Sequence, residues 1–337
     1  MFRQEKDFPL LKEMFSLDDL DVAPPSVVPA KIYPPIHCLL LDESRQEEMN
    51  SWKLAMNLLE TRVDTVDTCS YVLVFSSYKQ LLQLQTKAKI VYVWNPNEEN
   101  NLSTVQHKKV FENWIYPQSN HFAPIINILT EGSPVRVMPQ IWGPESMPEI
   151  VYNCQEKDNS EGTDIVIVSD HVSSTSLVFP LLACELVEAH NPKYIKNVIV
   201  ISSTPFESKD YESLLIQPKI KYVVCKADDI VPYFSKRKQY SVFLYHQMNT
   251  TANPALLWKL VYTGFPLVHN LKTSLQVGIK YVDNEVHKAA KFVTVAKESF
   301  VQAYVDRNRQ SLLSLHPLND TTKDIVKKTL DEWTKPV

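Results

Sequence analysis

The sequence contains very little glycine: 5 residues among 337, against about 7% in a typical globular protein. No two of these glycines lie within ten positions of each other. A GxGxxG dinucleotide turn, a GxxxxGK[ST] phosphate loop and a GxSxG nucleophile turn all need closely spaced glycines. The sequence therefore excludes all three motifs, and a bound phosphate group has to be held by a helix N-terminus or by side chains.

Paired cysteines and long apolar runs are also missing. The five cysteines are scattered and include no CxxC pair, so a zinc ribbon or a thioredoxin-like site is not indicated. No run approaches the roughly 18 apolar residues of a membrane span, and the N-terminus has no apolar segment of signal-peptide length. The net charge of -4 gives no general attraction to nucleic acid or to anionic membranes. We therefore predict a cytoplasmic protein with no membrane span and no nucleic-acid partner.

Short apolar runs recur along the chain, and each is apolar on both faces. Runs of about five β-branched and aromatic residues with this pattern are typical of parallel strands that helices cover on both sides. The predicted strands are 36–41, 71–75, 90–94 and 135–141, and then 164–168, 197–201, 220–225, 241–245 and 266–269. The predicted helices are 44–61, 176–190, 255–263 and 320–333.

A polar stretch at 154–162 interrupts this alternation and is interpreted as a linker. Residues 1–30 are charged and then rich in proline, which indicates an N-terminal arm rather than a core element. The blocks 31–153 and 163–315 predict two doubly wound, Rossmann-like α/β domains that face each other across a cleft, and 316–337 forms a terminal helix. In such sheets, ligands bind beyond the carboxyl ends of the strands.

The segment 245–270 carries the clearest functional signal. A buried strand ends at Tyr245, a polar loop follows, and the Asn-Pro pair at 253–254 has the pattern of a helix start. Gly264 then ends the helix as a left-handed cap, and the next strand returns to the same rim. Unpaired N–H groups at the start of the helix favour an anion such as a diphosphate. The candidate binding residues on this rim are His246, Gln247, Asn253, His269 and Asn270.

These residues also have purely structural interpretations. The two histidines can brace the neighbouring loops through hydrogen bonds, and Asn253 can serve only as the cap of the helix. Asn270 can bind a ligand or cap the following segment. The sequence leaves these alternatives open.

Several motifs of this region occur together in one family. His246-Gln247 follows a strand, Asn253 opens a helix, GFPLVHN occupies 264–270, and Gly278 precedes Tyr281-Val282-Asp283. This order resembles a GT-B-like family of glycosyltransferase-like proteins found in bacteria and in large DNA viruses, over residues 85–295. The resemblance implies the two-domain GT-B fold, in which the C-terminal domain mainly holds a nucleotide-sugar donor and the N-terminal domain receives the acceptor. The nucleotide-sugar is then the substrate, and no separate cofactor is expected.

One position departs from the family pattern. The family usually has an acidic residue in the middle of the helix after the Asn, and the matching position here is Trp258, whose indole can only donate a hydrogen bond. This departure, the low glycine content and the N-terminal arm support an alternative hypothesis. The chain is then a catalytically inactive GT-B-like structural or interaction protein, for example one associated with a virion, and its arm binds a protein partner.

Two catalytic candidates follow strands elsewhere in the sequence. Glu98 lies in an Asn-Pro-Asn-Glu-Glu loop that would face the cleft, where a carboxylate can act as a general base; a solvated turn is the competing interpretation. His171 follows the strand at 164–168 and has Asp170 beside it in sequence. A formal DxD at 19–21 lies in the arm rather than after a buried strand, so we predict no metal site.

Overall fold

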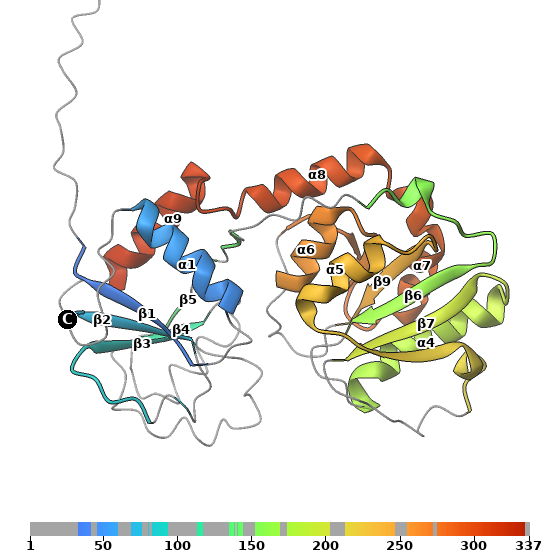
Figure 1. Cartoon of the computed structure of the whole chain (residues 1–337), viewed down its shortest axis with the longest axis horizontal. Helices are drawn as coiled ribbons and strands as arrows, with labels where there is room; N and C mark the ends of the chain where they lie inside the picture. Colours follow the sequence, from blue (N-terminus) through green and yellow to red (C-terminus); the bar gives the residue numbers. More distant parts are fainter. Residues whose placement is uncertain are drawn as a thin grey trace, which may run out of the picture. The chain divides into compact units, whose positions relative to one another are not determined.

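Two parallel β-sheets organise the described part of the chain (Figure 1). The described residues 139 and 141–143 lie, in sequence, between the last strand of the first sheet and the first strand of the second. The computed structural model describes residues 33–41, 46–59, 69–75, 80, 83–93, 113–116, 135–137, 139, 141–143, 152–168, 174–202, 213–246, 255–271 and 275–333. The predicted N-terminal arm lies outside these residues.

The first sheet is fully parallel, with its strands in the order in which they occur in the chain. All four strands predicted in this half are confirmed. One further strand, β4, was not predicted, since Asn-Trp-Ile-Tyr is too short and mixed to stand out. The strands are β1 (Ile36–Leu40), β2 (Tyr71–Phe75), β3 (Lys89–Val93), β4 (Asn113–Tyr116) and β5 (Val135–Val137).

Helices from both ends of the chain build the core of this first sheet. Helix α1 (Gln46–Leu58) follows β1, and helix α9 (Asp320–Trp333) begins 274 residues after the start of α1. The rings of Trp52 and Trp333 stack with centroids 5.6 Å apart, and the Tyr33 hydroxyl donates to an Asp331 carboxylate oxygen over 2.8 Å. The terminal helix therefore belongs to the core of the first sheet.

The second sheet is also parallel, but its strand order is β11-β10-β9-β6-β7-β8. The chain runs from β6 outward to β7 and β8, and then returns to the other side of β6 to add the remaining strands. This reversal is the topological switch point of a Rossmann-like sheet, and it lies between β6 and β9. The strands are β6 (Thr163–Val168), β7 (Ile195–Ser202), β8 (Ile220–Val224), β9 (Ser241–Tyr245), β10 (Leu267–His269) and β11 (Ile279–Lys280).

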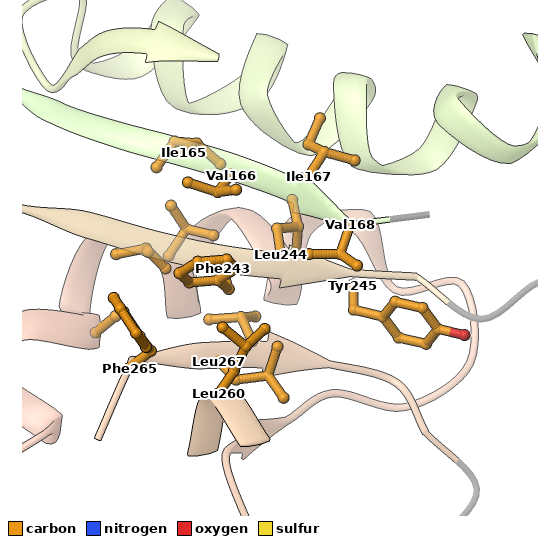
Figure 2. Packing of buried hydrophobic residues seen from close by; sticks show 14 of the residues in the cluster. Ile165, Val166, Ile167, Val168, Phe243, Leu244, Tyr245, Leu260, Phe265 and Leu267 are labelled. Carbon is orange, nitrogen blue, oxygen red and sulfur yellow. The ribbon is translucent and has the colours of Figure 1, made fainter. Parts of the chain in front are cut away.

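Strands β6 and β9 form the centre of the second core (Figure 2). All their residues are buried, and Ile165, Val166 and Leu244 have no exposed surface. Around this centre, α4 contacts α7, and α6 contacts both α5 and α8. The helices of this half are α4 (Ser174–His190), α5 (Ala227–Ser235), α6 (Ala255–Thr263), α7 (Val286–Ser299) and α8 (Gln302–Leu313).

The polar stretch 154–162, interpreted from the sequence as a linker, packs against the second sheet. Cys154 is 3% exposed and its Sγ donates to the Phe300 carbonyl oxygen over 2.9 Å. The Tyr240 N–H donates to the Asp158 carbonyl oxygen over 2.7 Å, just before β9 begins. These contacts make the stretch part of the second domain, because its backbone pairs with the residues just before β9 and its one apolar side chain is buried.

Among the described helices, none combines the length and the apolar character that crossing a bilayer requires.

Candidate functional site

The carboxyl ends of four neighbouring strands form one edge of the second sheet. Val168 at the end of β6 pairs in register with Tyr245 at the end of β9, and both are labelled in Figure 2. Tyr245 pairs in turn with His269 of β10, which pairs with Lys280 of β11. Ligands of doubly wound sheets bind beyond such an edge, at the switch point. The candidate site is therefore placed here.

His246 is the first residue after β9, and it is 7% exposed. Its Nε2 lies 3.1 Å from the Asn284 Oδ1, and its Nδ1 lies 2.8 Å from the Tyr281 hydroxyl. An amide oxygen only accepts, so Nε2 carries the proton and Nδ1 accepts from the hydroxyl. Burial lowers the pKa of His246, which keeps the ring neutral and maintains this arrangement.

Two aromatic rings pack near the imidazole of His246. Phe179 of α4 stacks on it with centroids 4.5 Å apart and an interplanar angle of 16°. The ring of Tyr281, whose hydroxyl bonds to Nδ1, lies 5.9 Å from it between centroids and 20° from parallel. Three segments that are far apart in sequence therefore converge on one side chain at the switch point.

His269 lies one strand further along and has no exposed surface. Its Nδ1 accepts from the Leu271 N–H over 3.1 Å, and its Nε2 donates to the Val277 carbonyl oxygen over 2.7 Å. Burial lowers the pKa of His269 to about 4. Both ring nitrogens are thus used by the backbone, so His269 braces the loop after β10 and offers no nitrogen to a ligand.

Gly278 is required by this arrangement. Its φ is +64°, and a Cβ at this position would lie 2.9 Å from the His269 Cδ2. A side chain here would both strain the backbone and push into the imidazole. The glycine quoted in the family pattern therefore serves the packing of His269.

Asn270 is 6% exposed and its Nδ2 donates to the Asp283 carbonyl oxygen over 3.1 Å. Asp283 has a φ of 43°, in the left-handed region that non-glycine residues seldom adopt. Asn270 therefore holds the backbone of the turn at 281–284 over the edge of the sheet, and His246 contacts the Tyr281 and Asn284 side chains of the same turn. Sequence reasoning noticed Tyr281 and Asp283 only as part of a family pattern, and it missed Phe179 and Asn284, for which no local signal exists.

Helix α6 ends as the sequence predicts. The φ of Gly264 is +104°, its N–H donates to the Val261 carbonyl oxygen over 3.1 Å, and the Phe265 N–H donates to the Leu260 carbonyl oxygen over 3.0 Å. This pair of bonds is a Schellman cap. A Cβ at Gly264 would lie 2.7 Å from the Tyr152 carbonyl oxygen, so the close approach also requires glycine.

Trp258 is a core residue of the second domain. It is 1% exposed and belongs to the same apolar cluster as β6 and β9. The position that departs from the family pattern is therefore filled by a side chain that packs inward. In this structure, the indole lines no exposed surface.

Four predicted site residues lie outside the described residues: Glu98, His171, Gln247 and Asn253. Their assignments stay predictions. Within the described ranges, no three His, Cys, Asp or Glu side chains are grouped as a metal site would require.

Several solved structures superimpose on this chain at low sequence identity. TarM superimposes with a TM-score of 0.56 at 10% identity, over 79% of this chain and 55% of that chain, so this chain spans little more than half of TarM. A UDP-forming α,α-trehalose-phosphate synthase from Burkholderia xenovorans gives 0.50 at 13% identity, over 88% of this chain and 80% of that chain. A glycosyltransferase from Rickettsia africae superimposes with a TM-score of 0.50 at 10% identity, over 90% of this chain and 100% of that chain.

The two Rossmann-like α/β domains with parallel sheets define a GT-B-like protein, as the sequence predicted. The chain belongs to the family described as protein of unknown function DUF2827, whose model matches residues 85–330. No curated protein sequence matches it. At identities of 10–13%, the likeness to the solved structures establishes the fold and not the reaction.

Proposed function

We propose that the chain is a GT-B-type glycosyltransferase, or a close relative of one, that uses a nucleotide-sugar donor without a metal ion. The observation that carries the proposal is the switch point between β6 and β9, with His246 held neutral directly after β9. A neutral, buried N–H donor suits the uncharged or partly charged oxygens of a donor molecule. The fold adds support, since the structure of S. aureus TarM in complex with UDP superimposes with a TM-score of 0.53.

Each candidate residue receives a role in this proposal. The diphosphate of the donor lies at the start of α6, beside Asn253, where helix N–H groups stabilise negative charge. Gln247 and His246 contact the donor at the end of β9. His269 and Asn270 keep the rim in shape through their backbone partners.

The reaction exchanges one bond for another. The bond between the anomeric carbon and the diphosphate oxygen of the donor breaks, and the nucleoside diphosphate leaves with the electron pair. The acceptor hydroxyl, bound by the N-terminal domain, forms the new bond to the anomeric carbon and loses its proton to a base, for which Glu98 is the candidate. His171 lies beyond β6, where a polar side chain can stabilise the charge that develops on the leaving group.

Thermal unfolding in the presence of UDP-, GDP- and ADP-sugars tests this proposal. A ligand present at one hundred times its Kd adds about 2.7 kcal/mol of apparent stability. We expect one donor class to raise the melting temperature equally with and without a chelator. Gln247→Ala and Asn253→Ala should weaken the effect, while Glu161→Ala, at the opposite end of β6, should keep it. No shift with any donor at millimolar concentration would overturn the proposal.

A second candidate function is a catalytically inactive GT-B-like structural or interaction protein, with its arm on a protein partner. The observation in its favour is Trp258, which fills the family's acidic position with a buried indole. Replacing Trp258 by glutamate does not separate the two candidates, since an unpaired carboxylate in this core would unfold the domain. Donor binding separates them: a chain that binds no nucleotide-sugar supports the second candidate.

A further inference from the structure

Asn284 is the exposed member of the group around His246. Its side chain is exposed, whereas Tyr281 and His246 are buried at 2% and 7% exposure. Among the described residues, the Asn284 side chain makes one hydrogen bond, from the His246 Nε2 to its Oδ1 over 3.1 Å. The Nε2–H group therefore points from the buried ring toward the solvent side of the sheet edge, where Asn284 covers it.

The imidazole itself is fixed from the inside. Phe179 stacks on the ring with centroids 4.5 Å apart, and the Tyr281 hydroxyl donates to Nδ1 over 2.8 Å. The ring cannot turn without losing these contacts. The direction of the Nε2 atom is therefore set independently of Asn284, while the Asn284 Oδ1 accepts the proton that Nε2 carries.

Hydrogen bonds that do not involve the Asn284 side chain hold the turn in which Asn284 lies. Asn270 bonds to the Asp283 carbonyl oxygen over 3.1 Å, and the Val286 N–H donates to the Asn284 carbonyl oxygen over 2.8 Å. Both bonds involve backbone oxygens of the turn. Removal of the Asn284 amide group leaves this framework intact, so the amide group is not needed as a brace.

We propose that Asn284 is a placeholder in the donor site: its amide oxygen occupies the hydrogen-bonding position on the His246 Nε2 that an oxygen of the bound donor takes. The inference rests on the proposed function, and it adds a residue that governs the affinity of the protein for the donor. The entering group is an acceptor oxygen, either of the diphosphate or of a sugar hydroxyl. It exchanges one partly buried hydrogen bond for another. The exchange costs little, because a single hydrogen bond of this kind contributes modestly to stability.

The test is the affinity of Asn284→Ala for UDP, GDP, ADP and their glucose conjugates, measured by calorimetry. Removal of the competing oxygen should tighten binding about 2- to 10-fold. Val282→Ala is the matched control, since Val282 lies in the same turn, is 57% exposed and carries no charge, and it should leave affinity unchanged. A gain with the free diphosphates assigns a phosphoryl oxygen, and a gain confined to the glucose conjugates assigns a sugar hydroxyl.

A double substitution shows whether the effect passes through the histidine. His246→Phe keeps an aromatic ring beside Phe179 and Tyr281 but has no Nε2–H group. In this background, the further substitution Asn284→Ala should not increase the affinity for the nucleotide. In the wild-type protein, the ¹⁵N resonance of Nε2 should shift when the ligand is added while that of Nδ1 stays in place.

The possible failures are distinguishable. Weaker or unchanged binding by Asn284→Ala, in a wild-type protein that does bind a nucleotide, overturns the placeholder and leaves the proposed function standing. A gain that persists in the His246→Phe background overturns it as well. If neither the wild-type protein nor Asn284→Ala binds any of the probes, both the placeholder and the proposed function are overturned.

Discussion

At the scale of single residues, His246 and His269 lie at the ends of neighbouring strands but form different kinds of contact. His246 forms hydrogen bonds with two side chains, one of which, Asn284, is exposed. Both ring nitrogens of His269 form hydrogen bonds with backbone groups. Their sequence contexts are alike, since each follows an apolar strand at the same rim. The sequence left a binding and a bracing role open for both, and the geometry assigns bracing to His269.

His269 makes folding sensitive to pH. Its pKa lies at about 4 in the folded protein, below the ordinary value of 6.5, so on acidification the unfolded chain takes up a proton before the folded chain does. Stability is complete above pH 6.5 and falls as the pH drops toward 4. The loss from this group is about 3 kcal/mol, from 1.36 kcal/mol per pH unit.

Urea unfolding between pH 7 and pH 4 measures this loss, and His269→Gln should show a correspondingly shallower pH dependence than the wild-type protein. His246, whose pKa is also lowered by burial, acts in the same direction. A ring ¹⁵N titration that placed the midpoint of His269 near 6.5 would contradict the expectation.

At the scale of elements, β6 is fixed at its amino end by a buried carboxylate. Asp164 has no exposed surface, and it accepts from the Asn197 amide over 2.6 Å and from the Arg237 guanidinium over 2.5 Å. The Asp164 backbone N–H also donates to the Tyr240 carbonyl oxygen over 3.0 Å. This cluster ties β6 to β7 and to the segment before β9, at the end of the sheet opposite the candidate site.

Arg237→Ala should destabilise the protein by about 3–5 kcal/mol, because it leaves the Asp164 carboxylate buried without its charged partner. Glu161→Ala is the matched control. It removes the ion pair of Glu161 with Lys196, whose side chains are 70% and 35% exposed, and should cost at most about 1 kcal/mol. Chemical denaturation of both variants measures the difference, and equal losses would mean that Asp164 is not held mainly by its arginine.

Two helices that sequence reasoning missed, α7 and α5, each give a weak signal in the sequence. Helix α7 buries Ala289, Ala290, Val293 and Ala296, small side chains that give a faint apolar pattern. Helix α5 contains Pro232, which usually argues against a helix interior. Strands β6 and β9 were evident because both faces of each are apolar, which is unusual outside a covered parallel sheet.

At the scale of the whole molecule, the last helix of the chain packs with its first strand and first helix. After it has completed the second sheet, it returns in α9 to the core of the first, where Val326, Leu330 and Trp333 pack with residues of β1 and α1. The sequence showed an amphipathic helix at this position but not its partner. The first domain is therefore complete only when the last helix has been added.

Trp333→Ala should remove about 3–5 kcal/mol from the stability of the first domain, since Trp333 is 3% exposed and stacks on Trp52. Ile325→Ala is the control on the same helix. Ile325 is 42% exposed, and its loss should cost about 0.5 kcal/mol or less. Hydrogen exchange of the amides in β1 and β2 reports on this domain directly, and unchanged protection in Trp333→Ala would contradict the assignment of α9 to its core.

The sequence by itself determined the two blocks of covered parallel strands and the cap of α6 at Gly264. These features depend on patterns within one short segment, where periodicity, β-branching and glycine placement act locally. Tertiary structure alone decided that α9 completes the first core, that Trp258 faces inward, and that Tyr281 and Asn284 meet His246. Each of these outcomes depends on groups dozens or hundreds of residues apart, and only the folded chain brings such groups within bonding distance.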